Sequence, residues 1–142
     1  MITEELRAAY RDFLTHTQLI SITLDTVTFR ALYMGGGKVG YRFAFVRGSG
    51  EYFRVVLQMK TFDNDGHCNF TCRYGANYGY DGGTQLIDVP DEMIWVYIHK
   101  NSRMHLYPYV RELAQGLMGR CGYTQSPLPL LLEVDADKKE EK

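Results

Sequence analysis

The chain has 142 residues, 45% of them hydrophobic, which suits one domain with enough apolar side chains for a core. Its 16 basic and 17 acidic residues leave a net charge of −1, so composition gives no electrostatic support for a general binder of nucleic acids. The three cysteines are an odd number, and neither a signal peptide nor an apolar run of roughly 18 residues is visible. We therefore expect a cytoplasmic protein without membrane insertion.

The first element that we predict is a short helix over residues 3–14. Thr3 can cap its first turn, which also carries the acids Glu4 and Glu5, and apolar residues recur at helical spacing between Leu6 and Leu14.

Four strands are predicted next, over residues 18–33, 39–46, 52–62 and 69–81. In the first strand the apolar alternation of residues 20–24 changes phase at Val27, which predicts a β-bulge near Asp25–Thr26. The short segments RGSG at 47–50 and DNDG at 63–66 are typical of turns between antiparallel strands.

The stretch RYGANYGYDGG, residues 73–83, predicts the second half of the fourth strand rather than a flexible loop. One parity of this strand is apolar and is expected to face inward: Phe70, Cys72, Tyr74, Ala76, Tyr78 and Tyr80. Arg73 and the glycines have the other parity and are expected to face outward.

Two helices follow in the prediction, over residues 92–100 and 106–119. The segment SPLPLLLEV is expected to be extended, and residues 135–142 form a charged tail that we expect to be disordered. The predicted fold class is α+β: a four-stranded antiparallel meander with two C-terminal helices on one face and a short N-terminal helix, in a single domain over residues 1–134.

No pattern of catalytic or metal-binding residues is visible. The four histidines are scattered, and GGGK at 35–38 lacks the context of a phosphate loop. His67, Cys68 and Cys72 are too few for a zinc site, and we expect Cys68 and Cys72 to be buried thiols on the apolar face. The expectation is a protein that is not an enzyme and needs no cofactor or metal.

The four predicted strands carry more apolar side chains than the predicted helices can cover. Self-association or a bound polypeptide is the physical expectation for such a surplus. The alternative is that the helices cover the sheet completely.

Several segments resemble the SecB family of export chaperones. HLYPYVRELAQGLMGRCGYTQSPLPLLLEV is similar to the C-terminal signature of the family, in which an aromatic-Pro-Tyr-x-Arg-Glu motif opens the long helix. ITLDTVTFRA, YFRVVLQMKTF and CNFTCRYGANYGYDG are similar to its first, third and fourth strands. The resemblance covers residues 16–134, and the helix at 3–14 is not part of the usual pattern.

The resemblance implies an ATP-independent holdase that assembles as a homotetramer, a dimer of dimers, and binds unfolded or partly folded clients in apolar aromatic grooves. Such a protein serves either protein export or the protection of an antitoxin. The candidate client-binding residues are Tyr33, Tyr41, Phe43, Tyr74, Tyr78, Tyr80 and Trp95. For each of them the alternative is a place in the core or in an oligomer interface.

The sequence departs from the family at the positions that bind the SecA motor. Acidic residues are usual there, whereas the matching residues of this chain are Thr26, Arg30 and Arg73. We therefore expect weak SecA binding, because basic residues would repel the basic, zinc-bearing SecA tail. The alternative function is a dedicated binding partner of one target. Binding of single-stranded nucleic acid by a tyrosine-bearing sheet is a third hypothesis, which the net charge disfavours.

Overall fold

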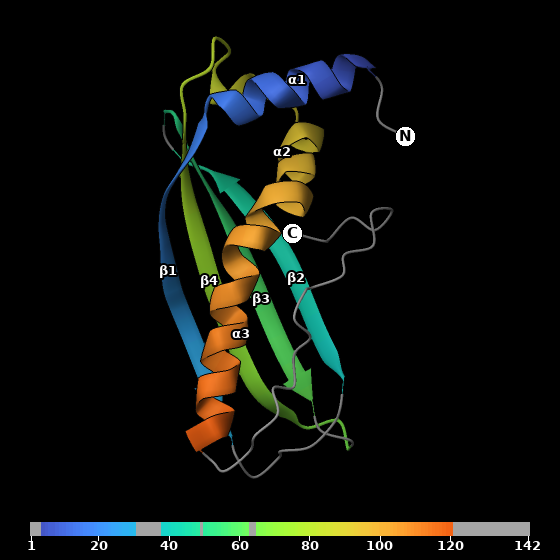
Figure 1. Cartoon of the computed structure of the whole chain (residues 1–142), viewed down its shortest axis with the longest axis vertical. Helices are drawn as coiled ribbons and strands as arrows, with labels where there is room; N and C mark the ends of the chain where they lie inside the picture. The colour runs from blue at the N-terminus through green and yellow to red at the C-terminus, as the bar shows by residue number, and fades with distance from the viewer. Residues whose placement is uncertain (1–3, 31–37, 49, 63–64, 121–142) are drawn as a thin grey trace.

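The computed structural model describes residues 4–30, 38–48, 50–62 and 65–120 (Figure 1). In chain order these form α1 (Glu4–Thr15), β1 (Thr17–Phe29), β2 (Val39–Arg47), β3 (Tyr52–Phe62), β4 (Cys68–Tyr80), the 3-10 turn η2 (Leu86–Asp88), α2 (Asp91–Tyr97), the π-helical turn η3 (Ile98–Ser102) and α3 (Arg103–Arg120). The predicted strand end at 31–33, the SPLPLLLEV segment and the charged tail lie outside the described residues.

The four strands form one antiparallel sheet in the order β1-β4-β3-β2. The predicted fold class is confirmed, but the simple meander needs a correction, because β1 lies beside β4 and not beside β2. This is the Greek-key order. β1 and β4 both have 13 residues and pair along almost their whole length, from Thr17 opposite Tyr80 to Phe29 opposite Phe70, whereas β2 has nine residues.

The predicted β-bulge in β1 is confirmed. The register of β1 against β4 shifts between Leu24 and Thr26, and a second shift, which was not predicted, lies between Leu19 and Ser21. Because of the first shift, Leu24 lies opposite Tyr74 and Val27 lies opposite Cys72, so both apolar side chains share the inner face.

The predicted C-terminal helices are joined into one helical arm, which corrects the expected break between residues 100 and 106. The π-helical turn η3 carries the backbone from α2 directly into α3. The expected break contains no glycine or proline, and Pro108 lies within α3, so no residue in this stretch stops the helix.

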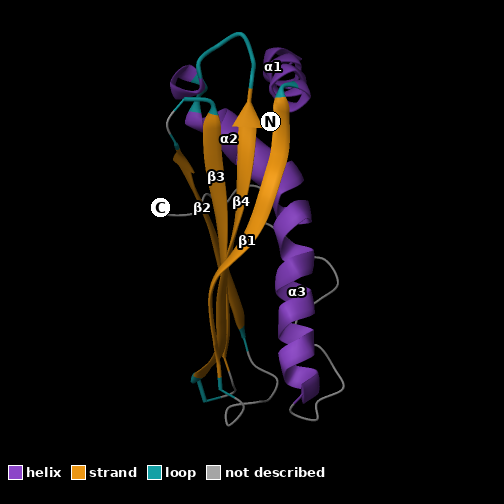
Figure 2. Cartoon of the chain, turned by 90° about the vertical axis from the view of Figure 1, so that its left-hand side faces the viewer, coloured by secondary structure: helices purple, strands orange, loops and turns teal. Residues whose placement is uncertain are grey.

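The core lies between the inner face of the sheet and the helical arm. Figure 2 shows α3 running along one side of the sheet. Leu106, Val110 and Ala114 of α3 are completely buried, as are Leu57 of β3 and Ala76 of β4. The inner face thus forms the core, and the outer face is the solvent side of the sheet.

Helix α1 crosses the end of the helical arm (Figure 1). One aromatic side chain, that of Phe13, attaches it to the core. Phe13 is only 2% exposed. Its ring centroid lies 5.1 Å from that of Tyr80, 5.5 Å from that of Tyr97 and 5.9 Å from that of Phe53. Helix α1 is therefore part of the main core.

Candidate functional site

The tyrosines of β4 lie mostly in the core. Tyr78 is completely buried and stacks on Phe53, with 5.0 Å between the ring centroids. Its hydroxyl donates to Ser102 Oγ over 3.1 Å and lies 2.9 Å from His105 Nδ1. Burial raises the pKa of Tyr78 to about 12, although the hydrogen bond with Ser102 acts in the opposite direction. Tyr78 therefore stays neutral and helps to hold α3 on the sheet.

On the β1 margin of the inner face, apolar side chains stay partly exposed. We call Leu24, Val27 and Phe29 the β1 strip; Leu24 is 44% exposed and Val27 is 43% exposed. Tyr109 of α3 extends this surface, since it is half exposed and its ring centroid lies 5.9 Å from that of Tyr74, the cross-strand neighbour of Leu24. This margin of the sheet can contact an apolar segment of another chain.

The β2 margin carries a second apolar surface, which is richer in aromatic rings. We call Val39, Tyr41 and Phe45 the β2 strip, all of which have the inner-face parity and are at least partly exposed. The Tyr41 ring packs edge-on against buried Phe43, with 6.0 Å between centroids. The Phe45 ring packs edge-on against Trp95 of α2 at 5.4 Å. Rigid aromatic rings of this kind bind apolar side chains with little loss of conformational entropy.

Arg47 fixes the end of the β2 strip. Its guanidinium carbon lies 5.4 Å from the centroid of the Phe45 ring, and its Nη2 is 2.8 Å from Asp91 Oδ1. The same side chain donates hydrogen bonds to the backbone carbonyls of Leu86 and Val89. Arg47 therefore ties the loop that precedes α2 to the edge of the sheet, beside Trp95.

The predicted client-binding residues separate into groups. Tyr41 is half-buried, and Phe43 and Trp95 are buried beneath the β2 strip. Tyr78 and Tyr80 lie in the core that contacts Phe13 and α3. Tyr74 is buried next to Tyr109, and Tyr33 lies outside the described residues.

Sequence reasoning missed four partly exposed apolar residues of the inner face and of α3: Leu24, Val27, Phe45 and Tyr109. The phase change in β1 was a usable signal for Leu24 and Val27, since it places both on one face. Their exposure depends on which strands lie at the edges of the sheet, and local patterns do not determine that.

The outer face carries the positions matched to SecA binding. Thr26 and Arg73 are direct cross-strand partners, and Gln58 and Arg42 continue the same row across β3 and β2. Thr26, Arg42 and Arg73 are exposed, so the predicted outward direction of Arg73 is confirmed. Arg30, also exposed, follows the end of β1, where its backbone N–H donates to the Asn69 carbonyl over 2.8 Å.

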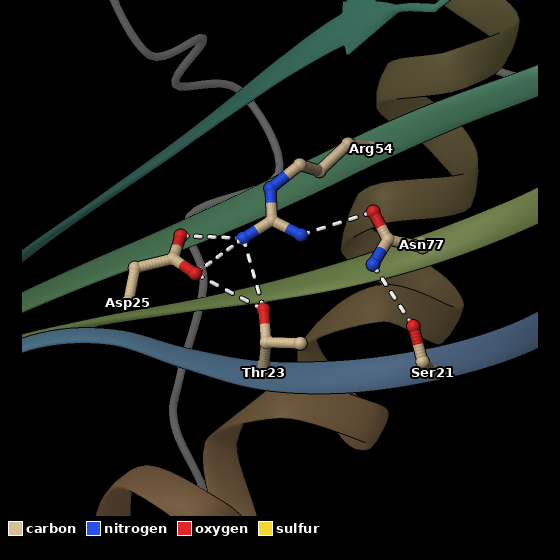
Figure 3. Close-up of polar contacts among 5 residues, drawn as sticks. All are labelled: Ser21, Thr23, Asp25, Arg54 and Asn77. Carbon is tan, nitrogen blue, oxygen red and sulfur yellow. Dashed lines mark hydrogen bonds and ion pairs between the residues drawn. The ribbon is translucent and has the colours of Figure 1, made fainter.

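A polar network crosses three strands of the outer face (Figure 3). Arg54 of β3 makes an ion pair with Asp25 in the bulge of β1, with 2.5 Å between Nη2 and Oδ2, and also donates to Thr23 and Asn77. Burial alone would raise the pKa of Asp25, but hydrogen bonds from Arg54 and Thr23 and the charges of Arg54 and Arg73 hold the pKa below its ordinary value.

The described residues present no catalytic arrangement that we recognise. Among them no group of three His, Cys, Asp or Glu side chains is placed to hold a metal ion. Cys72 is buried, which raises the pKa of its thiol to about 12, and this matches the prediction for Cys72. Cys68 is exposed at the start of β4, so its predicted burial is wrong. None of the described helices is long and apolar enough to cross a membrane.

No protein-family model matches this sequence, and no curated protein matches it either. The sheet order and the helical arm nevertheless define a SecB-like fold, and the resemblance seen in the sequence is confirmed at the level of fold. The fold is similar to a solved Mycobacterium tuberculosis structure, the Rv1957 SecB-like chaperone in complex with a ChAD peptide from the Rv1956 HigA1 antitoxin. The TM-score is 0.64 at 19% sequence identity, and the match covers 94% of this chain and 100% of that chain.

Proposed function

We propose that this protein is an ATP-independent holdase that binds unfolded or partly folded polypeptides along its apolar margins. The observation that carries the proposal is the pair of apolar strips on the two edge strands, on a fold similar to that of a chaperone solved with an antitoxin-derived peptide. Holding a client by apolar contact needs no nucleotide and no catalytic group.

The proposed client contacts are the two strips together with their aromatic support. On the β2 side Tyr41 and Phe45 contact the client, and the buried Phe43 and Trp95 support their rings, with Tyr33 as a further candidate contact. An extended client presents every second side chain to one side, which suits a row of apolar residues on an edge strand. Tyr78 and Tyr80 would then act indirectly, by supporting the sheet from within.

The proposed assembly is a cytoplasmic homotetramer, a dimer of dimers. Partly exposed apolar residues on both edge strands support association, because a monomer would leave them in water. The two strips need not have the same role: one can lie in a subunit interface while the other binds clients.

A dedicated partner, such as one antitoxin, is the second candidate function. Its support is the outer face, where Arg73 and Arg42 share a row with Thr26 and where SecB proteins that bind SecA carry acids. A chaperone that does not bind SecA cannot pass its client to that motor. A chaperone that serves one bound target has no client to pass on. Pull-down with mass spectrometry separates the candidates: one dominant partner supports the dedicated protein, and a broad set of unfolded proteins supports the general holdase.

The test of the holdase proposal combines aggregation of an unfolded client with light scattering of the assembly. We expect a tetramer that delays client aggregation. Tyr41→Asp, on the β2 strip, should reduce this delay several-fold, because the charge must enter an apolar contact. Lys60→Asp, on the outer face of the neighbouring β3, introduces the same side chain and should leave the delay unchanged. A monomer without any effect on aggregation would exclude the proposal.

A further inference from the structure

A hollow lies between α1 and α2, at the end of the molecule where α1 crosses the helical arm in Figure 1. It has a volume of about 390 Å³, and its apolar lining comes from Leu6 and Tyr10 of α1 and Val96 of α2. These three side chains are half-buried, so the floor of the hollow is accessible. Because Leu6 and Tyr10 of α1 form part of the lining, the hollow depends on this helix.

Three cations surround the apolar floor: Arg7 and Arg11 on α1 and Lys100 on η3. Arg7 and Arg11 are one helical turn apart, which separates them by roughly 6 Å along the helix axis. Arg7 has a weak ion pair with Glu4, at 4.0 Å and with both side chains well exposed. Within the part of the chain that the structure describes, no acid lies within ion-pair distance of Arg11 or Lys100.

One side of the hollow is held in place by its own contacts. The Tyr10 hydroxyl donates a hydrogen bond to Asn101 Oδ1, which joins α1 to the π-helical turn. The Lys100 ammonium lies 5.9 Å from the centroid of the Tyr10 ring, within the range of a cation–π contact. The ring and the cation are thus positioned before any ligand arrives, which lowers the entropic cost of binding.

We infer that this hollow, which we call the α1 pocket, binds an acidic polypeptide segment that inserts one aliphatic or aromatic side chain between carboxylates. The apolar floor receives the side chain, and the three cations receive the carboxylates. A single small carboxylate would leave two of the cations without a partner. A nucleic acid fits less well, because the floor is mostly aliphatic, from Leu6 and Val96, and offers a base only one aromatic ring, that of Tyr10.

The inference goes beyond the proposed function, since the α1 pocket is formed by α1, α2 and η3 and not by the β1 or β2 strip. It assigns the N-terminal helix a role in recruiting a partner with clustered Asp and Glu residues. Holdase activity and the α1 pocket are therefore separable by mutation.

Fluorescence anisotropy with a labelled peptide that carries one Phe between pairs of Glu residues tests the inference at low salt. We expect binding that weakens with added salt and weakens about tenfold in the triple variant R7A/R11A/K100A. The triple variant K38A/K60A/R120A removes the same charge from exposed positions outside the α1 pocket and outside the row of Arg42 and Arg73, and it should bind the peptide like the unchanged protein. Circular dichroism of both variants checks that α1 is retained.

Two further peptides and an oligonucleotide complete the test. A peptide with Gln in place of Glu, and one with Gly in place of Phe, should each bind several-fold more weakly. Equal losses in the two triple variants, or equal binding of the Gln peptide, would overturn the inference. A single-stranded oligonucleotide of equal charge that displaces the peptide at lower concentration would also overturn it, in favour of a general anion site.

Discussion

Arg54 shows how one side chain can organise a whole face of the sheet. Its guanidinium reaches from β3 across β4 to Asp25 in the bulge of β1, and it lies directly over Gly75. A Cβ added to Gly75 would lie 2.0 Å from Arg54 Nη2, which no real structure allows. Gly75 is therefore required for space rather than for backbone conformation, and it lets an arginine lie flat on the sheet.

Gly75→Ala should displace Arg54 and destabilise the protein by about 1–2 kcal/mol, because the partly buried Asp25 loses its ion pair and hydrogen bonds. Urea denaturation measures the change. Gly116→Ala is the matched control: a Cβ there meets nothing within 4 Å, so this change in α3 should be neutral or stabilise by about 0.5–1 kcal/mol. If both substitutions have the same effect, the contact with Arg54 is unimportant.

His105 should make stability depend on pH. Burial lowers its pKa, so between its folded pKa and the ordinary value of about 6.5 the unfolded chain binds more protons than the folded chain. The free energy of unfolding should therefore fall as the pH drops from 7 to 5. His105→Asn should flatten this part of the profile. Unfolding midpoints measured at several pH values for the unchanged protein and for this variant check the expectation, and an unchanged slope would contradict it.

At the scale of elements, α1 is a helix held by few contacts. Phe13 is its only buried residue, and the rest of its attachment is made by partly buried side chains such as Tyr10 and Leu6. Most of the stability of a 12-residue helix comes from tertiary packing, since isolated helices of this length are marginal in water. The position of α1, and with it the α1 pocket, thus depends mainly on the Phe13 anchor.

Phe13→Ala should cost about 3–4 kcal/mol, because it leaves a cavity between Tyr80, Tyr97 and Phe53. Limited proteolysis should then cut within α1 at a protease concentration that leaves the unchanged protein intact. Leu14→Ala, at a position that is 39% exposed, should cost less than about 1 kcal/mol and leave α1 protected. Equal protection of α1 in both variants would show that the anchor lies elsewhere.

At the scale of the whole molecule, charge is distributed unevenly. The outer face carries Arg42, Lys60 and Arg73 as exposed cations, while Asp25 on the same face is neutralised by Arg54. The chain nevertheless has a net charge of −1. A partner that approaches the outer face therefore meets positive charge, which governs both its rate of association and its selection.

The basic tail of SecA should bind this face weakly, and acids should improve the binding. Arg30→Glu together with Arg73→Glu should raise the affinity several-fold in a titration with the zinc-bearing SecA peptide, with the gain reduced by salt. Arg7→Glu together with Arg11→Glu makes the same change of charge on α1 and should produce no comparable gain. Tight binding of SecA by the unmodified protein would contradict the assignment of this face.

Sequence patterns predicted the features that depend on residues close together along the chain. Strand periodicity located the four strands and the bulge at Asp25–Thr26, and the inward row of β4 is buried as expected. The place of β1 beside β4 depends on pairing between distant segments, and so does the exposure of Leu24 and Val27. The α1 pocket could not be predicted either, because its lining combines Val96 and Lys100 with residues of a helix almost a hundred positions earlier in the chain.

The strand order has a consequence for the time at which the chain can fold. β1 is synthesised early, but its only strand partner in the sheet described here, β4, ends at Tyr80. Until β4 has left the ribosome, the apolar residues of β1 have no sheet to join, and this non-local pairing slows folding. The protein, for which we propose a role in protecting unfolded chains, is thus itself an unfolded chain during the first part of its synthesis.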